Sequence, residues 1–171
     1  FLHRNGVKIS ILTRRYPGMI KFERINAVPV HRLPSLGPKP IASLTFTISA
    51  IVKLFKLRPD ILHSHGLLSP ATIAIAAKKV LKIPIVAKIL RGGKVGDLDR
   101  IENKPFTRLR STGIRRNIDR FISISSEIEA ELSQFGIPAE KLVQIPNGVD
   151  TFKFTPLIAI EKISLRQSLN L

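Results

Sequence analysis

The segment VAKILRGGKVGD, residues 86–97, combines cations and glycines in a way that could bind phosphate. Arg91 and Lys94 supply positive charge, and Gly92 and Gly93 let the backbone approach a ligand closely. No Ser or Thr follows Lys94, so this is not a Walker loop, and the glycine spacing is not G-x-G-x-x-G either. The residues alone leave two interpretations open, a phosphate-binding loop and a plain surface turn.

Two histidines and a serine are the other residues whose side chains could take part in binding or catalysis. His63 and His65 alternate along a candidate strand, so both point to one of its faces. Two histidines without a third ligand do not make a zinc site, so we expect no metal and interpret one of them as a packed or hydrogen-bonding residue at the sheet edge. Ser125 lacks an evident His–Asp partnership, and capping a helix would account for it.

Alternating strands and helices would position these residues. Strands are predicted at residues 6–15, 22–34, 58–66, 82–90, 120–125 and 141–148. Four signals indicate the helices between them. The first is an apolar helical face of Leu44, Ile48, Ile51, Val52 and Phe55, and the second is an N-cap at Ser69 before Pro70. The third is a basic stretch at 104–119, and the fourth is a capping box of Ser126 with Glu129 before Gly136. This order predicts an α/β fold with a Rossmann-like, doubly wound parallel sheet covered by helices on both faces.

Ligands of such sheets bind beyond the carboxyl ends of the strands. The residues that follow the predicted strands are rich in glycine, hydroxyls and cations and poor in carboxylates, which suits an anionic, polyhydroxylated ligand. The candidate substrate-binding residues are His65, Gly66, Arg91, Gly92, Gly93, Lys94, Ser125, Asn147 and Gly148.

Charge and composition limit the partners. The 171 residues include 28 Lys and Arg against 12 Asp and Glu, a net charge of +16, which favours nucleic acid, anionic lipid or phosphate-bearing substrates. The absence of cysteine excludes disulfides and cysteine-based chemistry and fits a cytoplasmic protein. Residues 40–57 are the most apolar segment, but their lysines and hydroxyls argue against a membrane span.

Three segments resemble glycosyltransferase family 4. DRFISISSEIEAELSQFGIPAEKLVQIPNGVDTFKFTP, at 119–156, closely resembles the segment that joins the two domains of that family. RPDILHSHG, at 58–66, is similar to the family's PDIIHxH strand, and IPIVAKILRGGKVGDLDRI, at 83–101, looks like a subgroup with an Arg-Gly-Gly loop. Many members carry His-Gly where this chain has Arg91-Gly92, so no histidine role at the sugar is carried over.

The resemblance implies a GT-B fold, in which an acceptor-side and a donor-side domain face each other. Residues 1–150 would be the N-terminal acceptor-side domain without its first strand and glycine-rich loop, and residues 151–171 a linker and the start of the donor domain. The implied activity is that of a retaining hexosyltransferase of polysaccharide or glycolipid biosynthesis. It would transfer a sugar from a nucleoside-diphosphate sugar to a glycan or lipid-linked acceptor, with no metal and no cofactor, and this fragment alone would be inactive.

Two alternatives concern binding rather than catalysis. A basic nucleic-acid module is disfavoured because the chain has only nine Phe and one Tyr and no nucleic-acid motif, so we expect no nucleic acid. Attachment to an anionic membrane surface through basic helices is compatible with the transferase, since many acceptors are lipid-linked. The expected location is therefore the cytoplasm, peripheral at the inner face of the membrane.

Overall fold

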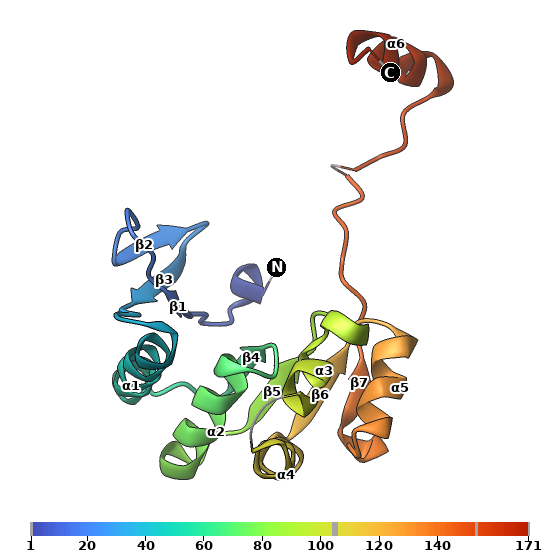
Figure 1. Ribbon diagram of the computed structural model, residues 1–171. Helices are drawn as coiled ribbons and strands as arrows, with labels where there is room; N and C mark the ends of the chain where they lie inside the picture. The colour runs from blue at the N-terminus through green and yellow to red at the C-terminus, as the bar shows by residue number, and fades with distance from the viewer. Residues whose placement is uncertain (1, 104–105, 153, 171) are drawn as a thin grey trace.

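The computed structural model describes residues 2–103, 106–152 and 154–170, with the exception of the side chains of residues 3 and 4. These residues form two sheets, flanking helices, and a C-terminal segment that extends away from both sheets (Figure 1). Residues 104 and 105, the start of the predicted basic helix, lie outside the described part. Most of the remainder of that stretch forms the predicted helix, α4 (Thr107–Asn117).

The first sheet contains β1 (Ile11–Arg14), β2 (Phe22–Ile25) and β3 (Val28–Leu33) in the order β1-β3-β2. β1 runs parallel to β3, and β2 runs antiparallel to it. The single strand predicted over 22–34 is therefore wrong, because the chain reverses within it. Asn26 and Ala27 adopt φ angles of 49° and 67°, the positive values that a two-residue hairpin turn needs.

The second sheet is wholly parallel and contains β4 (Leu62–His65), β5 (Ile85–Lys88), β6 (Arg120–Ser123) and β7 (Leu142–Gln144) in sequence order. The connecting helices include α2 (Ser69–Leu81), α3 (Asp97–Glu102), α4 and α5 (Ser126–Gln134), and short 3₁₀ turns lie at Leu2–Asn5, Gly93–Val95 and Ala139–Lys141. The predicted Rossmann-like α/β class is confirmed, but the expected cover of helices on both faces of this sheet is wrong for the described residues, because the strands follow one another in sequence order.

Side chains on the two faces of this sheet differ in burial. Ile85, Ala87 and Phe121 are fully buried beneath the helices. Because right-handed crossovers between strands in sequence order place their helices on the same face, the opposite face is covered less in the described residues. His63 and His65 are exposed there, so the candidate residue His65 lies on this open face.

Two helix starts lie one residue away from their predicted positions. The N-cap of α5 is Ser125, whose Oγ accepts a hydrogen bond from the N–H of Ile128 at 3.4 Å, so the predicted capping box of Ser126 and Glu129 is wrong. β6 ends at Ser123, which leaves Ser125 as the extended residue before the helix. At α2, Ser69 is the first helical residue and Leu68 is the N-cap.

The helix α1 (Lys39–Leu57) joins the two sheets and packs on α2. Its buried face is formed by Ala42, Phe46, Ala50 and Leu54. The helical face identified from the sequence lies on the other side, where only Ile51 contributes to the core and Leu44, Ile48, Val52 and Phe55 are exposed.

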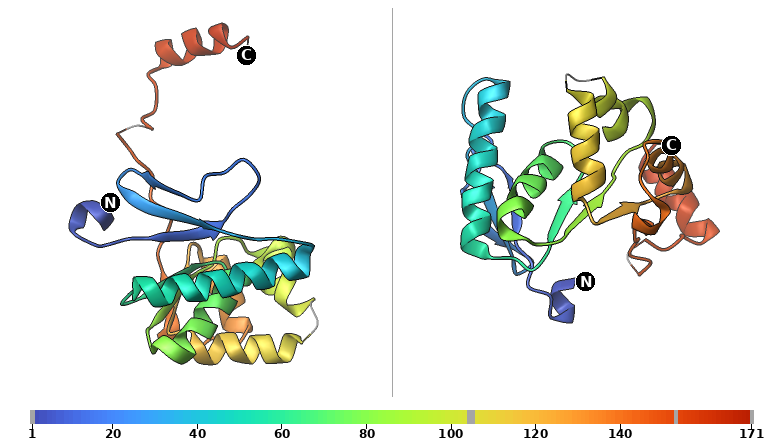
Figure 2. Two further views of the ribbon diagram at one scale, coloured as in Figure 1. Left: turned by 90° about the vertical axis from the view of Figure 1, so that its left-hand side faces the viewer. Right: turned by 90° about the horizontal axis from the view of Figure 1, so that it is seen from below.

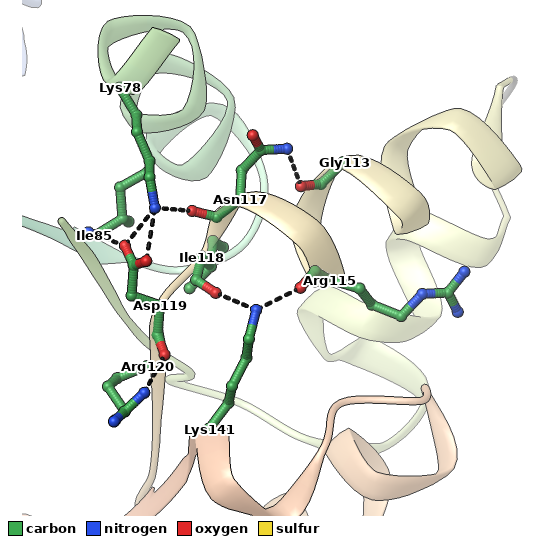
Figure 3. A network of polar contacts seen from close by, with 9 residues as sticks. All are labelled: Lys78, Ile85, Gly113, Arg115, Asn117, Ile118, Asp119, Arg120 and Lys141. Carbon is green, nitrogen blue, oxygen red and sulfur yellow. Dashed lines mark hydrogen bonds and ion pairs between the residues drawn. The ribbon is translucent and has the colours of Figure 1, made fainter. Parts of the chain in front are cut away.

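Hydrogen bonds and an ion pair connect α2 and α4 to the amino-terminal ends of the strands in the second sheet (Figure 3). Lys78 of α2 contacts the Asp119 carboxylate at 2.6 Å, and that carboxylate accepts the N–H of Ile85 at 2.7 Å. Lys141, just before β7, reaches back to the end of α4. The backbone carbonyls that accept from these two lysines belong to Arg115, Asn117 and Ile118. This end of the sheet is thus occupied by structural contacts.

The C-terminal helix α6 (Ala159–Ser168) follows an extended segment that leads away from the second sheet (Figure 1). None of its described residues is buried. The helix predicted after Asp150 is therefore present.

Candidate functional site

A row of three polar residues crosses the carboxyl end of the second sheet. His65 ends β4 and stands opposite Lys88, which ends β5. Lys88 Nζ donates to Asn147 Oδ1 at 2.7 Å, across 59 positions of sequence. The fold thereby joins two predicted site residues, His65 and Asn147, through a lysine that the strand pattern had not identified.

The two histidines of β4 lie against each other on the open face of the sheet. Their ring centroids are 4.5 Å apart. Partial burial lowers the pKa of His63 below its ordinary value of 6.5, and the charges of His65 and Lys88 lower it further. His63 is consequently neutral at physiological pH, so its ring offers one hydrogen-bond donor and one acceptor to a ligand.

The Arg-Gly-Gly loop after β5 is held in place by an acidic side chain of α5. Glu131 Oε1 accepts the N–H of Gly93 at 2.7 Å. A Cβ added at Gly92 would lie 2.7 Å from the same oxygen, so a side chain at this position would displace the Glu131 carboxylate. Gly92 and Gly93 therefore serve the contact with Glu131, while Arg91 and Lys94 stay exposed and available to an anion.

Gly66 allows the turn after β4 to close onto a buried carboxylate. Its φ is +98°, and an added Cβ would lie 2.8 Å from Asp97 Oδ2. Asp97 is only 8% exposed, and Oδ2 accepts the N–H of Leu67 at 2.7 Å. This contact ties the loop after β4 to the start of α3, beside the Arg-Gly-Gly loop.

The last two candidate residues have different surroundings. Ser125 caps α5, as its sequence context indicated, which engages its hydroxyl within the chain. Gly148 is exposed, and an added Cβ would meet no atom within 4 Å. Neither observation adds a ligand-binding contact to the row of His65, Lys88 and Asn147.

Lys88 was not among the predicted site residues, and Arg14, which the sequence places at a strand end, has structural contacts. Lys88 could have been noticed as a cation inside an otherwise apolar parallel strand. Arg14, at the end of β1, stacks 4.8 Å from the ring of Phe46. Its guanidinium also donates to the hydroxyls of Ser35, Ser43 and Ser69. Arg14 thus links β1 to α1 and α2.

The described residues hold no group of three His, Asp or Glu side chains arranged to bind a metal ion. Two hollows in the described part of the chain lie away from the row of His65, Lys88 and Asn147. One lies at the end of α1 and the other between α2 and α4, and neither is lined by the candidate residues. The candidate site is therefore an open wall of cations, imidazoles and an amide.

Comparisons with known proteins agree with this architecture. The family model of Glycosyltransferase Family 4 matches residues 1–153. A structure of sucrose-phosphate synthase from Thermosynechococcus elongatus superposes with a TM-score of 0.68 at 18% identity, covering 99% of this chain and 90% of that one. No curated protein sequence matches.

A second similar protein is Anabaena HepE. Its complex with UDP-glucose superposes with a TM-score of 0.64 at 16% identity, and this chain spans 37% of that protein. Its complex with UDP superposes with a TM-score of 0.65 at 15% identity, covering 96% of this chain and 50% of that one. A parallel four-stranded sheet with a polar carboxyl end, in a chain whose family match extends over residues 1–153, shows that the protein belongs to glycosyltransferase family 4 and has the fold of the N-terminal half of a GT-B glycosyltransferase.

Proposed function

We propose that the chain is the acceptor-side half of a retaining hexosyltransferase, which moves a sugar from a nucleoside-diphosphate sugar to a glycan or lipid-linked acceptor. The observation that carries this proposal is the row of His65, Lys88 and Asn147 at the carboxyl end of a parallel sheet, beside a loop that exposes Arg91 and Lys94. The complexes of HepE with UDP and UDP-glucose support a nucleotide-sugar donor.

In this proposal the cations and the imidazoles have separate tasks. Arg91 and Lys94 stabilise the negative charge that develops on the leaving diphosphate, which is how preorganised cations lower such barriers. The neutral His63 and the Asn147 amide orient hydroxyl groups of a sugar, because both offer donors and acceptors. In this proposal no metal ion or cofactor takes part, so Arg91 and Lys94 compensate the negative charge of the diphosphate.

We also propose the domain division on physical grounds. Residues 1–150 form the acceptor-side domain without its first strand, and residues 151–171 lead to a donor domain. β1 and β4 are edge strands, and the outer edge of each has no strand partner in the described residues. An open edge presents unpaired backbone N–H and C=O groups, which another strand would pair. The segment after β7 exposes large apolar side chains that a second domain would cover: Val149, Phe152, Ile158 and Ile160.

The test is transfer of a labelled sugar by the complete enzyme that contains this chain. A panel of UDP, GDP and ADP sugars is offered with glycan and lipid-linked acceptors. The expected result is transfer from one donor class, with the anomeric configuration retained in the product by NMR. Inversion would refute the retaining mechanism, and hydrolysis or transfer from none of the donors would refute the transferase assignment.

A second test separates the proposed site from the fold. Lys88→Met removes the charge and the bond to Asn147, and Lys79→Met removes an exposed charge of α2 as a control. We expect Lys88→Met to lower kcat/KM by about 10- to 100-fold, the order of effect when one stabilising donor is lost. Equal activity of both variants would exclude the row as part of the site.

A further inference from the structure

The helix α1 exposes an apolar line opposite the face that it buries. Ile41, Leu44, Ile48, Val52 and Phe55, here called the α1 stripe, are 53%, 59%, 54%, 51% and 42% exposed. Their spacing of three and four residues aligns them along the helix, which at 1.5 Å per residue is about 28 Å long. Contiguous exposed apolar surface of this kind marks an interaction site.

The position of α1 determines how the stripe can be used. By length and composition α1 could cross a membrane. However, Phe46 and Leu54 on its other side are buried in the core, and α1 packs along α2 at the outer edge of the molecule (Figure 2, right). The helix is therefore a surface element of the folded chain, with the stripe facing outward along its length.

Positive charge accompanies the stripe. α1 contains three lysines and no acidic residue. At 100° per residue Lys56 lies beside the carboxyl end of the stripe, and the exposed Arg58 follows directly, whereas Lys39 and Lys53 lie toward the buried side of the helix. A helix with an apolar line and cations beside it has the composition of helices that lie in the interface of a membrane.

A hollow continues the stripe at its carboxyl end. It is about 340 Å³ in volume and is lined by Phe55, Arg58, Pro59, Leu81 and Ile83. Four of these side chains are apolar, and Arg58 brings a guanidinium to the same hollow. Apolar walls beside a guanidinium suit an acyl chain whose phosphate headgroup lies next to it.

We propose that the α1 stripe docks on an anionic lipid bilayer, with the axis of α1 parallel to the membrane plane and Arg58 at a lipid phosphate. The stripe enters the headgroup–acyl boundary, and Lys56 beside it contacts anionic headgroups. A second copy of this chain fits less well, because stacking two stripes would bring together two molecules that each carry a net charge of +16. The proposal does not depend on the transferase site.

The first experiment measures binding of the 171-residue chain to vesicles by co-sedimentation. Vesicles of phosphatidylcholine with phosphatidylglycerol are compared with phosphatidylcholine alone. The stripe variant L44S/I48S/V52S is compared with the matched control I20S/I61S/L109S, which changes three apolar residues that are 58%, 53% and 75% exposed elsewhere. We expect binding to the anionic vesicles, weakened by salt, with the stripe variant at least about tenfold weaker and the control unchanged.

Equal binding by the stripe variant and the control would overturn the proposal, since charge alone would then suffice. A salt-stable dimer that the stripe variant converts to monomer, without vesicle binding by either, would overturn it in favour of a second copy. Circular dichroism of each variant identifies loss of fold.

A reporter experiment avoids these multiple substitutions. The chain has no tryptophan, so Ile48→Trp and Leu109→Trp each introduce one fluorophore, the first in the stripe and the second on α4. Insertion of the stripe predicts a blue shift of the emission of the Ile48→Trp variant with anionic vesicles and no shift for the Leu109→Trp variant. An unchanged spectrum of the Ile48→Trp variant, or equal shifts in both variants, would refute the docking surface.

Discussion

Arg91 and Lys94 are the exposed cations of the Arg-Gly-Gly loop, and their role can be separated from that of the glycines. Glu131 engages the N–H of Gly93, whereas the charged side chains of Arg91 and Lys94 are exposed and available to an anion. We expect Arg91→Ala and Lys94→Ala to lower turnover of the complete enzyme by about tenfold or more while the fold survives. Steady-state kinetics tests the turnover, and melting curves test the fold. Unchanged kinetics in both variants would show that the loop is a surface turn without a role in catalysis.

Protonation of His63 links the candidate site to stability. The pKa of His63 is below 6.5 in the folded chain, mainly through burial, so the unfolded chain binds more protons in the pH range just below 6.5. The contribution of neutral His63 to stability is therefore complete above pH 6.5 and decreases as the pH falls through that range. NMR titration should show His63 titrating below its ordinary value, and a midpoint at or above 6.5 would contradict this account.

The turn after β4 makes Gly66 a structural requirement. With φ at +98° and Asp97 Oδ2 at 2.8 Å from an added Cβ, Gly66→Ala meets both strain and a clash. We expect it to destabilise the chain by about 1–3 kcal/mol. Gly113→Ala, inside α4 with open space around its added Cβ, should instead stabilise it by about 0.5–1 kcal/mol. Denaturant unfolding of the two variants tests the opposite signs.

The attachment of α2 to the sheet should make the fold sensitive to acid. Burial raises the pKa of Asp119, but the hydrogen bonds from Lys78 and from the N–H of Ile85, with the charges of Lys78 and Lys141, outweigh it and lower the pKa below 3.8 (Figure 3). The stability from ionised Asp119 is thus present above pH 3.8 and lost as the pH falls through the folded pKa.

Lys78→Met tests that attachment directly. It removes the ion pair with the partly exposed Asp119, and we expect a loss of about 1 kcal/mol near pH 7 that shrinks in acid. The exposed neighbouring change Lys79→Met should have little effect at any pH. Equal stability curves for the two variants would show that the contact does not hold α2.

At the level of the entire chain, the proposed two-domain enzyme makes the candidate site one wall of a binding site. A single wall buries little of the surface of a small ligand, whereas complete small-molecule sites bury most of the ligand surface. We therefore expect the 171-residue chain by itself to transfer no sugar, because groups around the leaving diphosphate must be preorganised on both sides. Turnover by this chain comparable to that of a complete enzyme would refute the proposed division into two domains.

Local sequence signals determined most elements of this protein. Parallel strands were recognisable from dense apolar runs, and Ser125 and Gly136 bracket α5 because capping and left-handed turns depend on adjacent residues. The hairpin between β2 and β3 was missed because Asn26-Ala27 lacks the glycine that usually marks such a turn.

The tertiary structure decided what depends on pairs of distant residues. Lys88 meets Asn147 across 59 positions and Glu131 meets Gly93 across 38, and neither pairing can be seen in a local pattern, because strand order and crossovers create it. The helix α1 has apolar residues on two opposite faces, so periodicity could not determine which face is buried. Packing against α2 and the sheet buried the face of small residues and Phe46, since small side chains allow close approach, and left the α1 stripe outside.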